Sequence, residues 1–158
     1  MKHIVLFFGL LLIVTIGIAQ EVNKVKITDL EKVISESKTP LVVNFWATFC
    51  IPCIEEIPHF QKQVKAHEKD GVKLLLVSLD LEDDYASVGP FAKKRKFTAP
   101  IVWLDETNAD YFIPKIDSTW SGAIPASLFI NNQKGYRKFV EEGLSEDEVR
   151  EEIEAMVR

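Results

Sequence analysis

The sequence has little of several residue types that define common functional sites. Its 158 residues include only two cysteines and three histidines, and it has no repeat, low-complexity tract or long basic block. A net charge of −5 without a basic block argues against a nucleic-acid partner. A zinc site would need two ligands besides the cysteines, and beyond the first 19 residues only His59 and His67 remain, about two turns apart on one predicted helix. We therefore expect neither a metal nor another cofactor.

The longest apolar run is short for a membrane span. It covers residues 4–18, which is 15 residues, whereas a spanning helix needs about 20. Lys2 precedes it, and the small residues Gly17 and Ala19 have the spacing that a signal peptidase reads. We interpret residues 1–19 as a cleaved signal peptide, with an uncleaved membrane anchor as the alternative. The protein is thus expected to be exported, to the periplasm.

The two cysteines lie close together in a chain that otherwise suits one domain, residues 20–158. In an oxidising compartment two cysteines usually form a disulfide. Cys50 and Cys53 are separated by only two residues, so a bridge between them closes a very short loop and gives little entropic stabilisation. Stabilisation is thus a weak reason for the pair, and thiol-disulfide exchange is a better one.

The cysteine pair stands between a predicted strand and a predicted helix. Residues 41–47 form an uncharged, β-branched and aromatic run typical of a buried strand, and a helical pattern begins near Ile54, with Pro52 suited to its first turn. The free amide groups and positive dipole end of this helix point at the Cys50 sulfur and favour its thiolate, since in such motifs the thiol pKa falls from about 8.5 to roughly 3.5–7.5. Cys50 is therefore the predicted nucleophile. Cys53, one turn further in, is the predicted resolving thiol.

The segment Trp46-Ala47-Thr48-Phe49-Cys50-Ile51-Pro52-Cys53 resembles the active site of the thioredoxin superfamily, and most of all its exported branch, the TlpA/ResA-type thiol:disulfide oxidoreductases. Asn44 supports this branch, in which Asn is common where thioredoxins proper carry a buried acid. Phe49 and Ile51 stand where the branch usually has Trp and Gly, a difference that bears on the redox potential and not on the reaction type. The resemblance implies an α/β thioredoxin-like fold, with a central mixed β-sheet flanked by helices on both faces.

Periodicity also predicts the helices. A capping box of Thr28 and Glu31 opens a helix that ends near Ser37, and Ser145 with Glu148 opens the last helix. Further helices are expected over residues 52–69 and 87–96, with a short one inside the irregular segment 105–122. On the helix after the cysteines, the apolar residues face the core and the polar residues face mostly away from it, among them Glu55, Glu56, Gln61, Lys62 and Lys65.

The remaining runs predict the strands. A short extended lead-in covers residues 21–26, and strands are expected over 41–47, 72–78, 101–104, 126–130 and 136–140, the last two joined as a hairpin. Short βα units followed by a hairpin and a helix indicate a mixed sheet with helices on both faces. This order agrees with the fold that the resemblance implies.

The resemblance also implies substrate-binding residues. Ile124-Pro125 matches the proline loop of thioredoxin-fold proteins, so its peptide bond is expected to be cis and to lie against the cysteine pair. The Ile124 backbone would then pair with an extended substrate segment, as in strand addition. Phe49, Ile51 and Trp120 are further predicted substrate contacts, although core packing is at least as good an interpretation of Trp120.

The acidic loop after strand 72–78 is the predicted source of a proton-transfer group. It contains Asp80 and Glu82, and members of the branch often place an acid there to help move the proton of the buried thiol. In open α/β sheets the carboxyl ends of the strands are where ligands bind. The alternative is a solvated acidic loop without a catalytic role.

The function that follows is a cycle of the Cys50–Cys53 pair between dithiol and disulfide. A copper or electron-transfer module would more often have wider cysteine spacing and a histidine in a later loop, and a peroxidase would have its cysteine after a Pro-x-x-x-Thr segment. By resemblance we expect a monomeric enzyme that reduces disulfides of other exported proteins and takes its electrons from a membrane thiol carrier. The alternative is a non-enzymatic peptide-binding module with a permanently oxidised cysteine pair.

Overall fold

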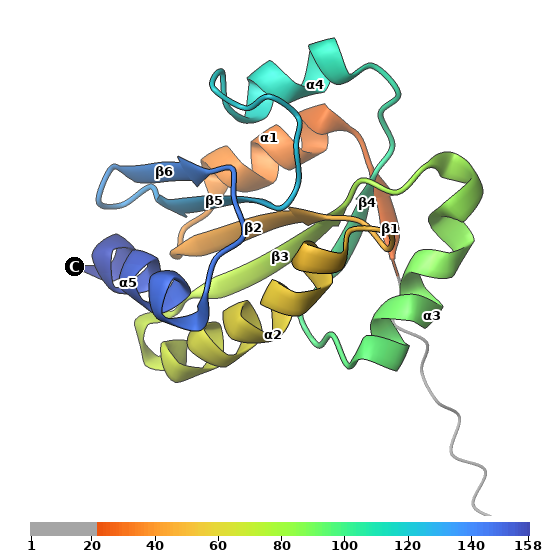
Figure 1. The fold of residues 1–158 in the computed structure, drawn as a ribbon. Coiled ribbons are helices and arrows are strands. Elements are labelled where there is room, and N and C mark those ends of the chain that lie inside the picture. Colours follow the sequence, from red (N-terminus) through yellow and green to blue (C-terminus); the bar gives the residue numbers. More distant parts are fainter. Residues whose placement is uncertain (1–21) are drawn as a thin grey trace, which may run out of the picture.

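A six-stranded mixed sheet forms the centre of the protein in the computed structural model, which describes residues 22–158 (Figure 1). The predicted signal peptide, residues 1–19, lies outside the described residues. Within them, no helix has both the length and the apolar character that crossing a membrane requires. The strands are β1 (Asn23–Val25), β2 (Leu41–Trp46), β3 (Lys73–Ser78), β4 (Ile101–Leu104), β5 (Ala126–Asn131) and β6 (Tyr136–Val140).

The strand order is β1-β4-β3-β2-β5-β6. The first four strands in that order are parallel to one another, and β5 and β6 are antiparallel to their neighbours. β2 is central, and all six of its residues are buried because the sheet is covered on both faces. The registers Leu41↔Lys73 and Trp46↔Ser78 bring the carboxyl ends of β2 and β3 together, where the cysteine loop begins.

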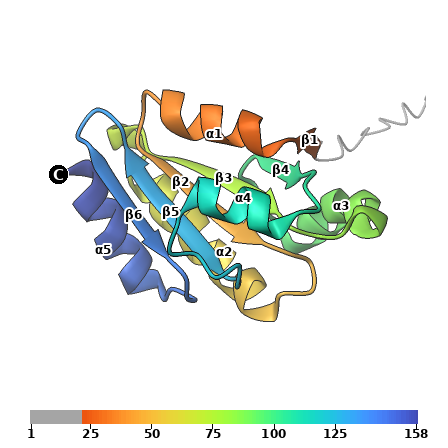
Figure 2. The ribbon, with the colours of Figure 1, turned by 90° about the horizontal axis from the view of Figure 1, so that it is seen from above.

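Helices cover both faces of the sheet (Figures 1 and 2). Ile27, Leu30 and Ile34 of the first helix pack with Val43 and Phe45, whereas Val149, Ile153 and Met156 of the last helix pack with Val42 and Phe129 on the opposite face. The alternation of inward-facing residues along β2 and β5 thus supplies two cores, one on each side. One face carries α1 (Ile27–Glu36) and α4 (Ala109–Ile116), and the other carries α2 (Ile51–Ala66), α3 (Tyr85–Arg95) and α5 (Glu146–Val157).

These layers confirm the predicted thioredoxin-like fold and most element positions. The extended lead-in is strand β1, which pairs with β4, and the irregular segment holds α4. The capping box of Ser145 and Glu148 is present at the start of α5. The box predicted from Thr28 and Glu31 is wrong, because α1 begins at Ile27 and Asp29 accepts the hydrogen bond from the Lys26 N–H at 3.2 Å.

Candidate active site

Cys50 and Cys53 form a disulfide at the first turn of α2, with their Cα atoms 5.3 Å apart. Cys50 occupies the N-cap position, and its sulfur accepts a hydrogen bond of 3.3 Å from the Cys53 N–H. The sulfur therefore lies at the positive end of the helix, where partial charge favours a thiolate once the bond is reduced. Cys50 is 7% exposed and Cys53 is fully buried. The two sulfurs thus differ in access, with Cys50 the outer one.

The Ile124–Pro125 loop lies beside the strand that leads to the cysteines. Its peptide bond is cis, and the register Phe45↔Ala126 sets Pro125 next to the carboxyl end of β2. Ile124 packs against both cores of the sheet. Neither the N–H nor the C=O of Ile124 has a hydrogen-bond partner among residues 22–158, so this backbone is available to an added strand.

Asp80 fixes the loop between β2 and the cysteines. Its carboxylate accepts hydrogen bonds from the Thr48 N–H at 2.9 Å, from the Thr48 hydroxyl and from the Ser78 hydroxyl at 2.7 Å. Asp80 is buried, and these three donors hold its carboxylate against Thr48 and Ser78, so Asp80 shapes the turn. Glu82 begins the short 3₁₀ helix η2 (Glu82–Asp84) and is exposed.

Glu56 is the carboxylic acid that the sequence periodicity misplaced. Helical periodicity predicts it on the polar face of α2, yet it is only 3% exposed. Its Oε1 accepts a hydrogen bond of 2.7 Å from Asn44 Nδ2, and its Oε2 accepts one of 2.8 Å from the Leu144 N–H. Because Glu56 follows Cys53 by three residues, the two side chains share one face of the helix.

Burial dominates the electrostatics of Glu56. Loss of solvation raises the pKa of its carboxyl to about 7, although the hydrogen bonds from Leu144 and Asn44 and the charge of His59 act in the opposite direction. A group with this pKa exchanges protons readily near neutral pH. The signal that could have found Glu56 is Asn44, a polar residue in the buried strand β2, which needs a partner on the helix packed above it.

The exposed apolar side chains near the cysteines fit a substrate surface. Phe49 is 65% exposed and Ile51 is 67% exposed, and they flank Cys50 in sequence. Leu81, directly after Asp80, is also exposed. Trp120 belongs to the core instead, which was the alternative interpretation of this residue: its ring lies 4.8 Å from that of Phe45, centroid to centroid.

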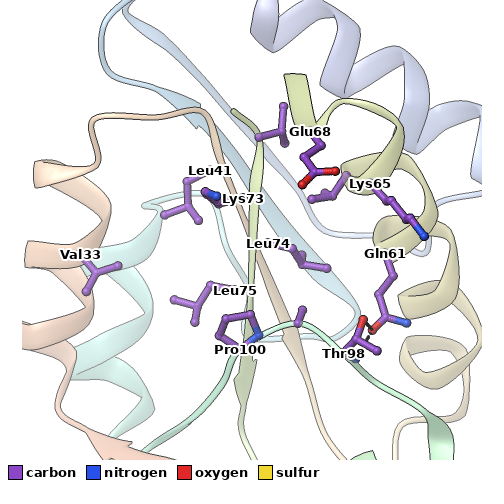
Figure 3. A pocket seen from close by; sticks show the side chains of 13 residues that line it. Val33, Leu41, Gln61, Lys65, Glu68, Lys73, Leu74, Leu75, Thr98 and Pro100 are labelled. Atoms are coloured by element: carbon purple, nitrogen blue, oxygen red, sulfur yellow. Dashed lines mark hydrogen bonds between the residues drawn. The ribbon is translucent and has the colours of Figure 1, made fainter. Parts of the chain in front are cut away.

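A cavity of about 700 Å³ lies at the other end of the parallel strands. It opens around the first residues of β3, with Val33 and Leu75 on one side of the strand and Leu74, Gln61 and Lys65 on the other (Figure 3). Since the disulfide follows the carboxyl end of β2, this cavity takes no part in the site described above. Among residues 22–158, no group of three or more His, Cys, Asp or Glu side chains is arranged to hold a metal ion.

Comparison with known proteins agrees with this geometry. The model of a family described as AhpC/TSA matches residues 14–137. Sporulation thiol-disulfide oxidoreductase A of Bacillus subtilis (strain 168) is 39% identical over 98 residues, which are 60% of this chain and 53% of the relative. Thiol-disulfide oxidoreductase ResA of Geobacillus thermodenitrificans (strain NG80-2) is 24% identical over 114 residues, 72% of this chain and 61% of the relative.

A similar fold occurs among solved structures. The crystal structure of StoA from Bacillus subtilis superposes with a TM-score of 0.55 at 27% identity, over 76% of this chain and 86% of StoA. The similarity to ResA and StoA confirms the resemblance to TlpA/ResA-type thiol:disulfide oxidoreductases. The aligned part of this chain spans between about half and three fifths of the length of the two curated relatives.

Proposed function

The chain belongs to the AhpC/TSA family, and from this premise we propose that it is an exported thiol:disulfide oxidoreductase that reduces disulfides of other exported proteins. The observation that carries the proposal is the Cys50–Cys53 disulfide at the start of α2, with the outer sulfur at the helix N-cap and cis-Pro125 beside the same strand end. Relatives named thiol-disulfide oxidoreductases support it. Export rests on the sequence of residues 1–19 alone.

The reaction runs through a mixed disulfide. In the reduced protein, the Cys50 thiolate attacks one sulfur of the target's disulfide, and the other target sulfur leaves as a thiolate. The Cys53 thiol then loses its proton and attacks the Cys50 sulfur, which forms the Cys50–Cys53 disulfide and releases the second target sulfur. The target gains two electrons, and the protein loses them. A thiol donor must reduce the pair again, and by resemblance this donor is a membrane thiol carrier.

Glu56 accepts the proton of Cys53 in this scheme. Cys53 is fully buried, so its thiol cannot deliver a proton directly to water. The Glu56 carboxyl lies on the same helix face, and a pKa of about 7 leaves a large ionised fraction at neutral pH. The role predicted for Asp80 or Glu82 stays an alternative; we favour Glu56 because it lies on the helix of Cys53, whereas the Asp80 carboxylate binds Thr48 and Ser78 and Glu82 is exposed.

Substrate recognition combines backbone pairing with apolar contact. An extended target segment would pair with the free N–H and C=O of Ile124 while its side chains pack on Phe49, Ile51 and Leu81. These contacts hold the target sulfur in line with Cys50. A reacting pair held this way gains rate through orientation alone.

Reduction of insulin by dithiothreitol tests the enzymatic proposal. The wild-type protein should accelerate the precipitation of insulin chains, and Cys50→Ser should not. Equal rates would favour the alternative, a peptide-binding module with an inert disulfide. The reduction potential then tests the direction, since values of about −270 mV are typical of a reductant and values of about −120 mV of an oxidant.

A further inference from the structure

Glu141, just after β6, forms hydrogen bonds to the loop that precedes cis-Pro125. Its carboxylate oxygens accept hydrogen bonds from the Ser121 N–H at 3.1 and 3.0 Å, from the Ser121 hydroxyl, and from the Ala123 N–H at 3.0 Å. These bonds lower the pKa of the Glu141 carboxyl, so the group is charged at neutral pH. One surface carboxylate thus binds two of the three backbone amides directly before Ile124.

The turn between the two bound amides depends on a glycine. Gly122, between the two bound amides, has a φ of 96°, a conformation that L side chains rarely adopt. On the inner side, the buried Trp120 donates its indole N–H to the Ala123 carbonyl at 2.8 Å. Ala123 is therefore held at both its N–H and its C=O, and the next backbone groups along the chain are the unpaired ones of Ile124.

The residues that follow Glu141 contact both the proline and α2. Two residues later, a Cβ placed on Gly143 would lie 3.6 Å from Pro125 Cγ, so this backbone packs against the proline ring. The following Leu144 N–H donates to Glu56 Oε2 at 2.8 Å. The connection 141–144, which carries Glu141, thus lies against the proline ring and is bound to α2.

We propose that Glu141 is a positioning residue for substrate binding, which holds the 121–123 loop so that the Ile124 backbone is already extended when a target chain pairs with it. The inference rests on the proposed function. Fixing the loop in advance removes part of the ordering cost of binding, so its loss should weaken the affinity for peptide segments. The thiol chemistry at Cys50 should be less affected than the binding of the target chain.

Steady-state kinetics of Glu141→Gln with two disulfides test this. Insulin presents a polypeptide backbone to Ile124, whereas 5,5′-dithiobis(2-nitrobenzoate) does not. The amide has one acceptor oxygen, so it cannot satisfy all the Ser121 and Ala123 donors. We expect KM for insulin to rise roughly tenfold with a smaller change in kcat, and the ratio of kcat/KM for insulin to that for the small disulfide to fall by about the same factor.

Glu142→Gln is the matched control, because Glu142 is the exposed neighbour with no hydrogen bond or ion pair to any of residues 22–158. Ser121→Ala, which removes one donor, should change the ratio in the same direction by less. The inference is overturned if Glu141→Gln matches the control, or if both substrates lose equally, which would indicate a general structural role. A wild-type protein no faster than Cys50→Ser would instead overturn the proposed function and the inference with it.

Discussion

Asn44 in β2 donates a hydrogen bond of 2.7 Å to Glu56 in α2, which ties the central strand to the helix that carries the disulfide. The same amide nitrogen also donates to Ser127 Oγ at 3.0 Å, whereas Asn44 Oδ1 has no partner among residues 22–158. The buried carboxyl therefore receives one donor from the strand and one from the Leu144 backbone. Several properties of the protein should depend on this group.

The free energy of unfolding of the oxidised protein should decrease as pH rises, because of Glu56. Its pKa rises from 4.5 to about 7 on folding, so the folded state binds more protons between these values. This stability is fully present below about pH 4.5 and is lost as pH rises through 7, a decline of about 3 kcal/mol by the usual linkage. Urea unfolding across this range should show the decline in wild type and in Glu55→Gln, which changes an exposed neighbour, but not in Glu56→Gln. If the free energy of unfolding of Glu56→Gln declined with pH as in wild type, Glu56 would not be the titrating group.

Glu56→Gln should also slow the release of the target. Without a carboxylate the Cys53 thiol loses its acceptor, and general-base catalysis is worth about 10²-fold or more. Quenched-flow analysis should detect accumulated mixed disulfide between Cys50 and insulin. The rate of target release should also no longer change with pH near 7. Glu82→Gln should keep the wild-type profile, since Glu82 is exposed on η2. A profile altered by Glu82→Gln instead would return the role to the acidic loop.

Asp80→Asn should destabilise the cysteine loop without removing the pH dependence. The amide keeps one acceptor oxygen where the carboxylate had two, so its NH2 group faces either a Thr48 or a Ser78 donor, and a buried donor left unsatisfied costs about 1–3 kcal/mol. Chemical denaturation of Asp80→Asn and of Asp83→Asn, an exposed control, measures the difference. If Asp80→Asn abolished the rate dependence near pH 7 while folding normally, Asp80 and not Glu56 would be the proton acceptor.

Gly122→Ala should be more costly than Gly135→Ala. Both glycines have positive φ, 96° and 65°, but a Cβ on Gly122 would lie 2.7 Å from Ile113 Cδ1, whereas one on Gly135 meets nothing within 4 Å. Strain of this kind costs about 1–3 kcal/mol, and the Gly122 value should lie toward the upper end. Thermal unfolding compares the two variants. Equal losses would mean that the loop before Ile124 adjusts freely.

The sequence by itself determined the central elements and the cysteine site. The uncharged run over β2 predicts a strand buried on both faces, and Ser145 with Glu148 marks the start of α5, because these signals are local and need no knowledge of neighbours. The position of Cys50 at a helix start follows in the same way. The error at Thr28 is a shift of the helix start: Lys26 is the N-cap, and Asp29 at N3 accepts from its N–H. A tertiary contact also meets this end of α1, because the Ile27 N–H donates to Glu106 Oε1 at 2.9 Å, and Glu31 forms an ion pair with Lys115 of α4 instead of a capping box.

Only the tertiary structure decided which polar residues serve the site. Periodicity places Glu56 with Glu55 on the polar side of α2. In the folded chain the segment before α5 covers part of that side and buries Glu56, which a helical pattern alone does not reveal. The hydrogen bond from the Ser121 N–H to Glu141 joins residues 20 apart in the sequence, next to Gly122 with its positive φ. No local sequence pattern predicts it. Hydrogen bonds between distant segments depend on how the layers pack, and that packing exists only in the folded chain.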